Sequence, residues 1–170
     1  IFFLQESLNW TTKASSGTLV VVGIIAIIVQ GGLIGPLVKQ FGEMRLTLIG
    51  SGFILVACAL LITAPKENAT INIYSAVSFL AVGAGLITPT LRALISKKLD
   101  VDKQGSILSN LQGLQSLGGV LGIAMAGRVY DSFGPKSPFI AGSVILLFMI
   151  YLIAEGKNNN SFNNQKSKVF

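Results

Sequence analysis

The chain has 170 residues, of which 51% are hydrophobic and only 12% are charged, whereas a soluble domain carries about a quarter charged residues. It contains no histidine and a single cysteine, Cys58, which excludes Ser-His and Cys-His nucleophile pairs, the common zinc sites and an intrachain disulfide. The net charge of +6 comes from residues between the apolar stretches and in the tail, so we expect no nucleic acid partner.

Long apolar stretches follow one another along the chain, each near the roughly 20 residues that cross a bilayer. Residues 1–4 resemble the end of a helix, and a polar segment follows them. We therefore predict an all-α membrane protein with five transmembrane helices plus the stub of a sixth. The helices are expected over about 18–38, 46–64, 71–95, 106–126 and 137–154. Residues 1–155 then form one transmembrane unit of a longer polypeptide, and the Asn-rich residues 156–170 form a disordered tail.

The connections between these helices differ in positive charge. Alternate connections, taken with the tail, hold nine basic residues against four in the other set. The positive-inside rule places the richer set, and with it the C-terminus, in the cytoplasm. The richer set consists of Lys39, Arg45, Arg92, Lys97, Lys98, Lys103, Lys157, Lys166 and Lys168, and the other of Lys13, Lys66, Arg128 and Lys136.

The predicted helices also differ in polarity. Those over 46–64 and 137–154 carry no amide or charged side chain, whereas the other three do. An amide that faced lipid would lack hydrogen-bond partners, so such groups turn toward the bundle interior or a wet cavity. We predict that the three polar helices line a cavity. The predicted solute contacts are Gln30, Asn110, Gln112, Gln115 and Ser116.

An alternative for these polar residues is hydrogen bonding between helices, worth about 0.6 kcal/mol per bond. Gln112, Gln115 and Ser116 share one face of a helix, which suits either interpretation equally. Small residues at four-residue spacing let helix backbones approach closely, and proline makes a helix easy to bend. We assign helix-packing roles to Gly31, Gly118, Gly122 and Pro89.

The short connection from Gly35 to Arg45 resembles the cytoplasmic signature loop of the major facilitator superfamily, Gly-x-Leu-x-Asp-(Arg/Lys)-x-Gly followed by basic residues. Here Gly35, Leu37, Gly42 and Arg45 fit that pattern, while Lys39 stands at the usual Asp position. The stretch from Gln104 to Gly134 resembles the eleventh helix of the drug:proton antiporter branch, which includes tetracycline efflux pumps. Gly83, Gly85 and Pro89 resemble its tenth helix.

The resemblance implies the C-terminal half of a 12-helix carrier: the end of helix seven and helices eight to twelve. It implies alternating access, a conformational gating loop formed by Gly35, Leu37, Lys39, Gly42 and Arg45, and proton-coupled efflux of a small amphipathic solute. The expected partners are that solute, protons, the lipid bilayer and an N-terminal six-helix half of the same polypeptide. We expect no metal, no cofactor and no enzymatic activity, and a bacterial inner membrane as the location.

A membrane sensor or assembly protein on the same scaffold is the alternative to a carrier. An intramembrane enzyme is disfavoured because histidine is absent and no carboxylate lies at mid-depth in the five predicted spans. For the same reason, we expect any proton-carrying acid to lie in the N-terminal half.

Overall fold

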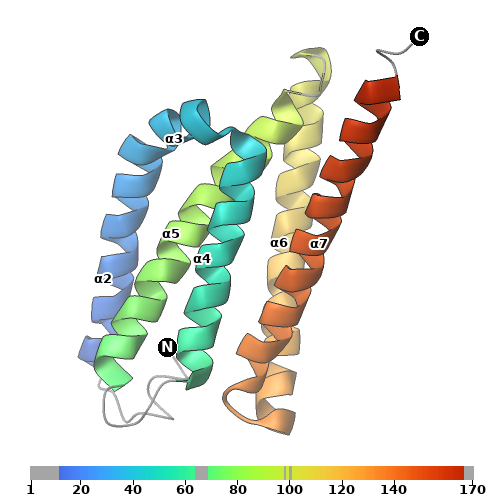
Figure 1. The fold of residues 1–170 in the computed structure, drawn as a ribbon. Coiled ribbons are helices and arrows are strands. Elements are labelled where there is room, and N and C mark those ends of the chain that lie inside the picture. The colour runs from blue at the N-terminus through green and yellow to red at the C-terminus, as the bar shows by residue number, and fades with distance from the viewer. Residues whose placement is uncertain (1–11, 64–68, 98, 100, 167–170) are drawn as a thin grey trace.

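The computed structural model describes residues 12–63, 69–97, 99 and 101–166, and the elements in this part are all helices (Figure 1). The all-α prediction is therefore confirmed. The helices alternate in direction along the bundle, as expected for successive spans. In chain order they are α2 (Thr12–Ile28), η1 (Val29–Leu33), α3 (Ile34–Phe41), α4 (Glu43–Thr63), α5 (Ala69–Ser96), α6 (Val101–Phe133) and α7 (Ser137–Lys166).

Among the described residues, three helices are long and apolar enough to cross a membrane: Ser16–Phe41, Glu43–Thr63 and Thr70–Ser96. Helix α6 has 33 residues and is easily long enough, but its amides and glycines make it too polar to join them. The apolar part of α7, Ser137–Ile153, is shorter. The chain is thus an integral membrane protein, and the two further predicted spans fold as helices whose own composition does not establish a crossing.

Several boundaries differ from those expected. The predicted helical stub over residues 1–4 lies outside the described residues, as do residues 167–170. Helix α6 extends beyond 106–126 at both ends, and α7 continues past residue 154 to Lys166. The sequence after Pro138 contains no further proline, so no residue type interrupts the helical hydrogen bonds there. Residues 156–166 are thus helical in the structure. The predicted disorder of the tail stays a prediction.

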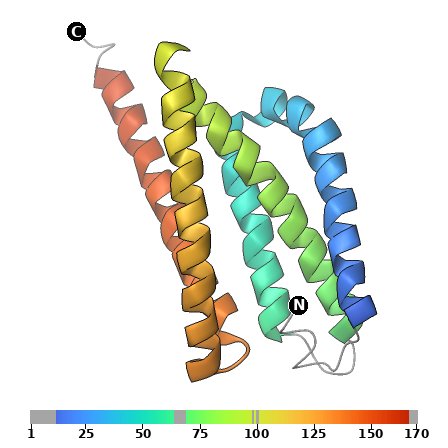
Figure 2. The same ribbon diagram turned by 180° about the vertical axis from the view of Figure 1, so that it is seen from behind.

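Helix α4 lies between α5 and α7, and α2 packs against the far side of α5 (Figures 1 and 2). One buried cluster joins η1, α4 and α5 through Val29, Leu46 and Leu86. A second joins α4 and α5 through Leu61, Ile73 and Ala76, with Phe139 of α7 packed against it. Helix α4, which carries no amide side chain, has α5 and α7 as neighbours on two sides, just as α5 has α4 and α2. Apart from Arg45 in its first turn, its exposed large residues, Ile49 and Val56, are apolar.

Two glycines let α4 and α5 approach backbone to backbone. A Cβ placed on Gly83 would lie 2.6 Å from the carbonyl oxygen of Gly50, and one placed on Gly50 would lie 3.0 Å from the carbonyl oxygen of Gly83. Near this contact, the buried Thr47 and Thr90 hydroxyls are 3.1 Å apart. Small residues and a hydroxyl pair therefore hold the two helices together, as is common between helices in lipid.

The predicted packing glycines lie elsewhere. Among the described residues, no atom outside the local helix lies within 4 Å of a Cβ placed on Gly31, Gly118 or Gly122. The reason is that η1 contacts α5 through Val29 instead, and that α6 is exposed along most of its length. Pro89 lies inside α5 without ending that helix. The contact predicted for these glycines is thus found at Gly50 and Gly83, and a role for them against other segments stays a prediction.

Candidate functional site

The fold gathers the basic connections at one end of the bundle. The α3–α4 and α5–α6 connections and the end of α7 all lie at the same end, and the α6–α7 connection lies at the other (Figure 1). Lys39, Arg45 and Lys97 therefore lie at one end, while Arg128 and Lys136 lie near the opposite connection. This grouping is the one on which the predicted orientation depends, since the positive-inside rule compares the two ends.

The predicted gating loop is a one-residue link between two helices. Helix α3 ends at Phe41, α4 begins at Glu43, and Gly42 between them has φ 76° and ψ 157°, a conformation open only to glycine. The Gly42 N–H donates to the carbonyl oxygen of Val38 at 2.9 Å, and the Gly42 carbonyl accepts from the Leu46 N–H at 3.1 Å. The link is therefore hydrogen-bonded to both helices.

The other loop residues divide into an anchor and an exposed set. Leu37 packs against the buried cluster of Val29, Leu46 and Leu86. Gly35, Lys39 and Arg45 are exposed. The basic groups of this loop are thus free to face water or another segment, while Leu37 fixes the loop to the bundle.

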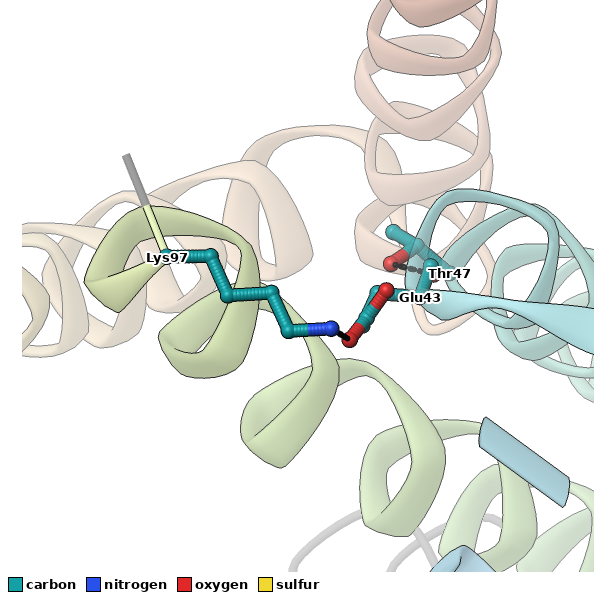
Figure 3. Close-up of polar contacts among 3 residues, drawn as sticks. All are labelled: Glu43, Thr47 and Lys97. Carbon is teal, nitrogen blue, oxygen red and sulfur yellow. Dashed lines mark hydrogen bonds and ion pairs between the residues drawn. The ribbon is translucent and has the colours of Figure 1, made fainter. Parts of the chain in front are cut away.

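An ion pair crosses from this loop to the next connection at the same end. Glu43, the first residue of α4, accepts from the ammonium of Lys97 just after α5 (Figure 3). The Glu43 side chain is 13% exposed and that of Lys97 is 69% exposed. A carboxylate in the first turn of a helix also interacts favourably with the helix dipole. Within α4 the Thr47 hydroxyl donates to the Glu43 backbone carbonyl oxygen at 2.9 Å, while the ion pair with Lys97 ties the Glu43 carboxylate to the end of α5.

A second polar link joins α5 to α6. The guanidinium of Arg92 donates a hydrogen bond to Oε1 of Gln112, and both side chains are exposed. Arg92 lies four residues before Ser96, the end of α5. The exposed Thr88 precedes it by one turn on the same face. Thr88 and Arg92, together with Gln112 of α6, thus form a polar strip on the exposed face of α5, which we call its open side.

Gln30 lies on the only stretch of π-helix in the described part of the chain, η1. It is exposed, and its Nε2 would lie 3.8 Å from a Cβ placed on Gly85 of α5. The Gln30 side chain therefore leans toward α5, where glycine leaves room for it. No hydrogen bond joins its amide to the described residues.

The remaining predicted contacts lie on α6. Asn110, Gln115 and Ser116 are exposed, and the Ser116 hydroxyl donates to the Gln112 carbonyl oxygen of its own helix at 3.0 Å. Asn110 is two residues from Gln112 and so points to another side of α6. The structure therefore places the side chains of Gln30 and Gln112 beside α5. It does not place Asn110 there.

Sequence reasoning did not assign Glu43 to this site, nor Thr47 and Thr90 to the helix contact. The signal for Glu43 was available, because an acidic residue directly after a turn glycine is a common helix start. The position of Arg92 near the end of its span is explained by snorkelling of its side chain alone, so the sequence does not predict it as a solute contact. Only the fold shows that Gln112 is its partner.

The model of the Major Facilitator Superfamily matches residues 1–123. The chain is 26% identical to the class C tetracycline resistance protein of Escherichia coli, over 76% of this chain and 32% of that protein. It is 28% identical to the class G tetracycline resistance protein of Vibrio anguillarum, over 90% of this chain and 39% of that protein. It is 24% identical to the human Hippocampus abundant transcript 1 protein, over 77% of this chain and 26% of that protein.

The chain spans about a third of the length of the first curated relatives that it matches, and no solved structure matches it. The resistance proteins among its relatives agree with the branch that the sequence resembled. The family model covers well over half of the 170 residues, so the chain belongs to the Major Facilitator Superfamily.

Proposed function

We propose that this chain is a transmembrane portion of a secondary carrier that exports a small amphipathic solute by alternating access, with protons as the coupling ion. The carrier resides in a bacterial inner membrane, with the α3–α4 link, the α5–α6 connection and the C-terminus in the cytoplasm. A further six-helix half of the same polypeptide completes it. Support comes from the family, from relatives named for tetracycline resistance, and from the grouping of basic residues at one end of the bundle.

One observation carries the proposal: polar side chains of three helices lie uncovered on the open side of α5. They are Gln30 on η1, Arg92 on α5 and Gln112 on α6, and all three are exposed. Polar groups inside a membrane face a wet cavity or a protein partner, since lipid offers them no hydrogen bonds. Arg92 and Gln112 bond each other and have further donors to spare, and a watery passage beside α5 would supply partners to these and to the Gln30 amide.

Proton coupling requires a titratable group within the membrane. The spans Ser16–Phe41, Glu43–Thr63 and Thr70–Ser96 hold no Asp or Glu apart from Glu43 at the very start of its helix. The acid that carries the proton therefore belongs to another part of the carrier. A full-length sequence without a membrane-embedded Asp or Glu would contradict proton coupling.

The experiment is uptake of tetracycline and a panel of amphipathic dyes into inverted vesicles that contain the full-length carrier. We expect accumulation that collapses when the pH gradient is removed. Gln112→Ala and Gln115→Ala should slow accumulation, because each removes an uncovered amide of α6. Asn72→Ala is the matched control, since it removes an amide from α5 far along the chain from Arg92 and Gly85.

Unchanged transport in both α6 variants would remove these glutamines from the solute path. If wild-type vesicles accumulate none of the compounds under any gradient, the carrier proposal fails. A sensor or assembly protein on the same scaffold, which needs the helices but no passage, would then be the better explanation.

A further inference from the structure

The π-helical turn η1 interrupts the first span. The N–H of Ile34 donates to the carbonyl oxygen of Val29, five residues earlier, in place of the four-residue spacing of an α-helix. Turns of this kind are rare in proteins, and those that occur are frequently located at functional sites. Two glycines, Gly31 and Gly32, lie within it, and Pro36 follows in α3.

Pro36 removes a hydrogen-bond donor from this turn. Proline has no backbone N–H, so it cannot bond to the carbonyl four or five residues before it. Those carbonyls belong to Gly32 and Gly31. The turn therefore has fewer donors than acceptors, and at least one glycine carbonyl oxygen lacks the amide partner that it would have in a regular helix.

None of the side-chain hydrogen bonds in the described part of the chain goes to the Gly31 or Gly32 carbonyl oxygen. Gly31 and Gly32 are exposed, and nothing lies within 4 Å of a Cβ placed on either. Neither glycine has a side chain to shield its carbonyl. Gln30, the neighbouring exposed residue, adds a carboxamide for which the structure gives no hydrogen bond to any described residue.

The turn also lies deep in the membrane. Gln30 is 14 residues from Ser16 and 11 from Phe41, the ends of the apolar segment, or about 21 and 17 Å along a helix. The hydrocarbon core is about 30 Å thick, so the turn is near its middle. Irregular backbone at that depth is tolerated only where it is buried in protein or lines a water-filled cavity.

We propose that this turn is a solute subsite that accepts hydrogen bonds from an N–H or O–H group, formed by the Gly31 and Gly32 carbonyl oxygens and the side-chain oxygen Oε1 of Gln30. This proposal rests on the proposed carrier function. Carbonyl oxygens only accept hydrogen bonds, so the subsite selects donors over carboxylates, and a protonated amine suits it best because a charged donor makes the stronger bond. A quaternary ammonium, which has charge but no N–H, makes no hydrogen bond with it.

The first test measures access to water. In the full-length carrier with Cys58→Ala, Gly32→Cys is exposed to a membrane-impermeant methanethiosulfonate. The control is Val56→Cys on α4, at similar depth on an exposed apolar face. We expect Gly32→Cys to be modified and Val56→Cys to be spared. Failure to modify Gly32→Cys would overturn the subsite, even if transport is normal, while modification without any transport would overturn only the carrier function.

The second test asks for the chemistry of the ligand. Pro36→Ala restores the missing N–H, and binding of a protonated tertiary-amine dye to the purified carrier is compared with that of its N-methylated quaternary analogue. We expect about threefold to tenfold weaker binding of the tertiary amine, the value of one hydrogen bond in a membrane protein, and no change for the quaternary dye. Gln30→Leu should act in the same direction.

Pro138→Ala is the control for removal of a proline. Pro138 stands in the first turn of α7, where a helix has no use for the N–H, so both dyes should bind as in wild type. Equal weakening of both dyes by Pro36→Ala would indicate general distortion of the helix. That result, or unchanged binding of the tertiary amine in both Pro36→Ala and Gln30→Leu, would overturn the proposal.

Discussion

The pair of helices α4 and α5 and the single helix α6 show two opposite ways of using a helix in the same membrane. In the pair, Ile73 and Ala57 are fully buried, whereas Ile123 of α6 is 78% exposed. The pair meets backbone to backbone at Gly50 and Gly83, whereas a Cβ placed on any glycine of α6 meets no atom of a neighbouring described helix within 4 Å. The more apolar helices are thus the more closely packed ones.

This difference teaches what drives association in lipid. Lipid tails are as apolar as leucine, so close packing and hydrogen bonds decide which helices join. Helices α4 and α5 have small residues at one contact and a threonine pair beside it. Helix α6 instead presents amides around its surface. Among the described residues two side-chain bonds join it to α5: Arg92 donates to Gln112, and Gln104 donates to the Ser96 carbonyl oxygen at 3.1 Å. A rigid pair beside a loosely held polar helix suits a passage whose wall can move.

The largest expected effect separates the two regions by burial. Ile73→Ala should lower the free energy of unfolding by about 2 kcal/mol, because it removes buried methyl groups and leaves a cavity. We expect the low end of the range for a buried isoleucine because an unpacked helix exposes its side chains to lipid and not to water. Ile123→Ala should change it little. Thermal unfolding of the full-length protein in detergent measures both. An equal loss for Ile123→Ala would show that the surface of α6 is covered in the whole carrier, and would confine the comparison to this part of the polypeptide.

The next effect concerns the backbone contact. Gly83→Ala should destabilise the fold by about 1–3 kcal/mol, the range for overpacking, because its Cβ would meet the Gly50 carbonyl oxygen at 2.6 Å. Gly52→Ala, in open space on α4, should be neutral or stabilising by up to about 1 kcal/mol, since alanine favours a helix. Equal unfolding temperatures for the two variants would contradict the close approach.

The helices could be predicted because apolar length and polar interruptions are written locally in the chain. The absence of helix contacts at Gly31, Gly118 and Gly122 among the described residues could not be predicted. Glycines at four-residue spacing make a close contact possible, but they do not tell which face of the helix a neighbour occupies. Glycines at 50 and 83 are far apart in sequence and follow no shared pattern. Only the crossing of α4 and α5 brings them together.

The candidate site was predictable to a similar degree. Gln30 and Gln112 were expected on polar faces because lipid cannot satisfy an amide, and both are exposed beside α5. The π-turn around Gln30 was not expected, since a Gly-Gly pair before a proline suggests bending without specifying a five-residue hydrogen bond. The pairing of Glu43 with Lys97 depends on two connections meeting at one end of the bundle, which is a property of the fold.

A smaller effect is expected from the buried hydroxyl pair. Thr90→Val keeps the shape of the side chain but removes the acceptor of Thr47, so we expect a loss of about 0.6 kcal/mol. Thr47 retains the Glu43 carbonyl oxygen as a partner at 2.9 Å, which keeps the loss small. Thr88→Val, on the exposed face of the same helix, should not change the unfolding temperature. A larger loss for Thr88→Val would mean that this face is packed in the full-length protein.

The smallest effect concerns the ion pair between Glu43 and Lys97. Lys97 is 69% exposed, and exposed ion pairs contribute little to stability because water and salt screen them. Glu43→Gln and Lys97→Gln should each lower the unfolding temperature slightly in low salt and have no effect in high salt, whereas Lys103→Gln, an exposed lysine on α6, should have no effect in either.

The exchanged variant, Glu43→Lys with Lys97→Glu, separates the pair from the helix dipole. It should recover only part of the loss, because lysine at the first position of α4 is opposed by the dipole that favours glutamate there. Full recovery would assign the whole effect to the pair, and a loss that persists in high salt would indicate that Glu43 stabilises the link at Gly42 by contacts other than charge.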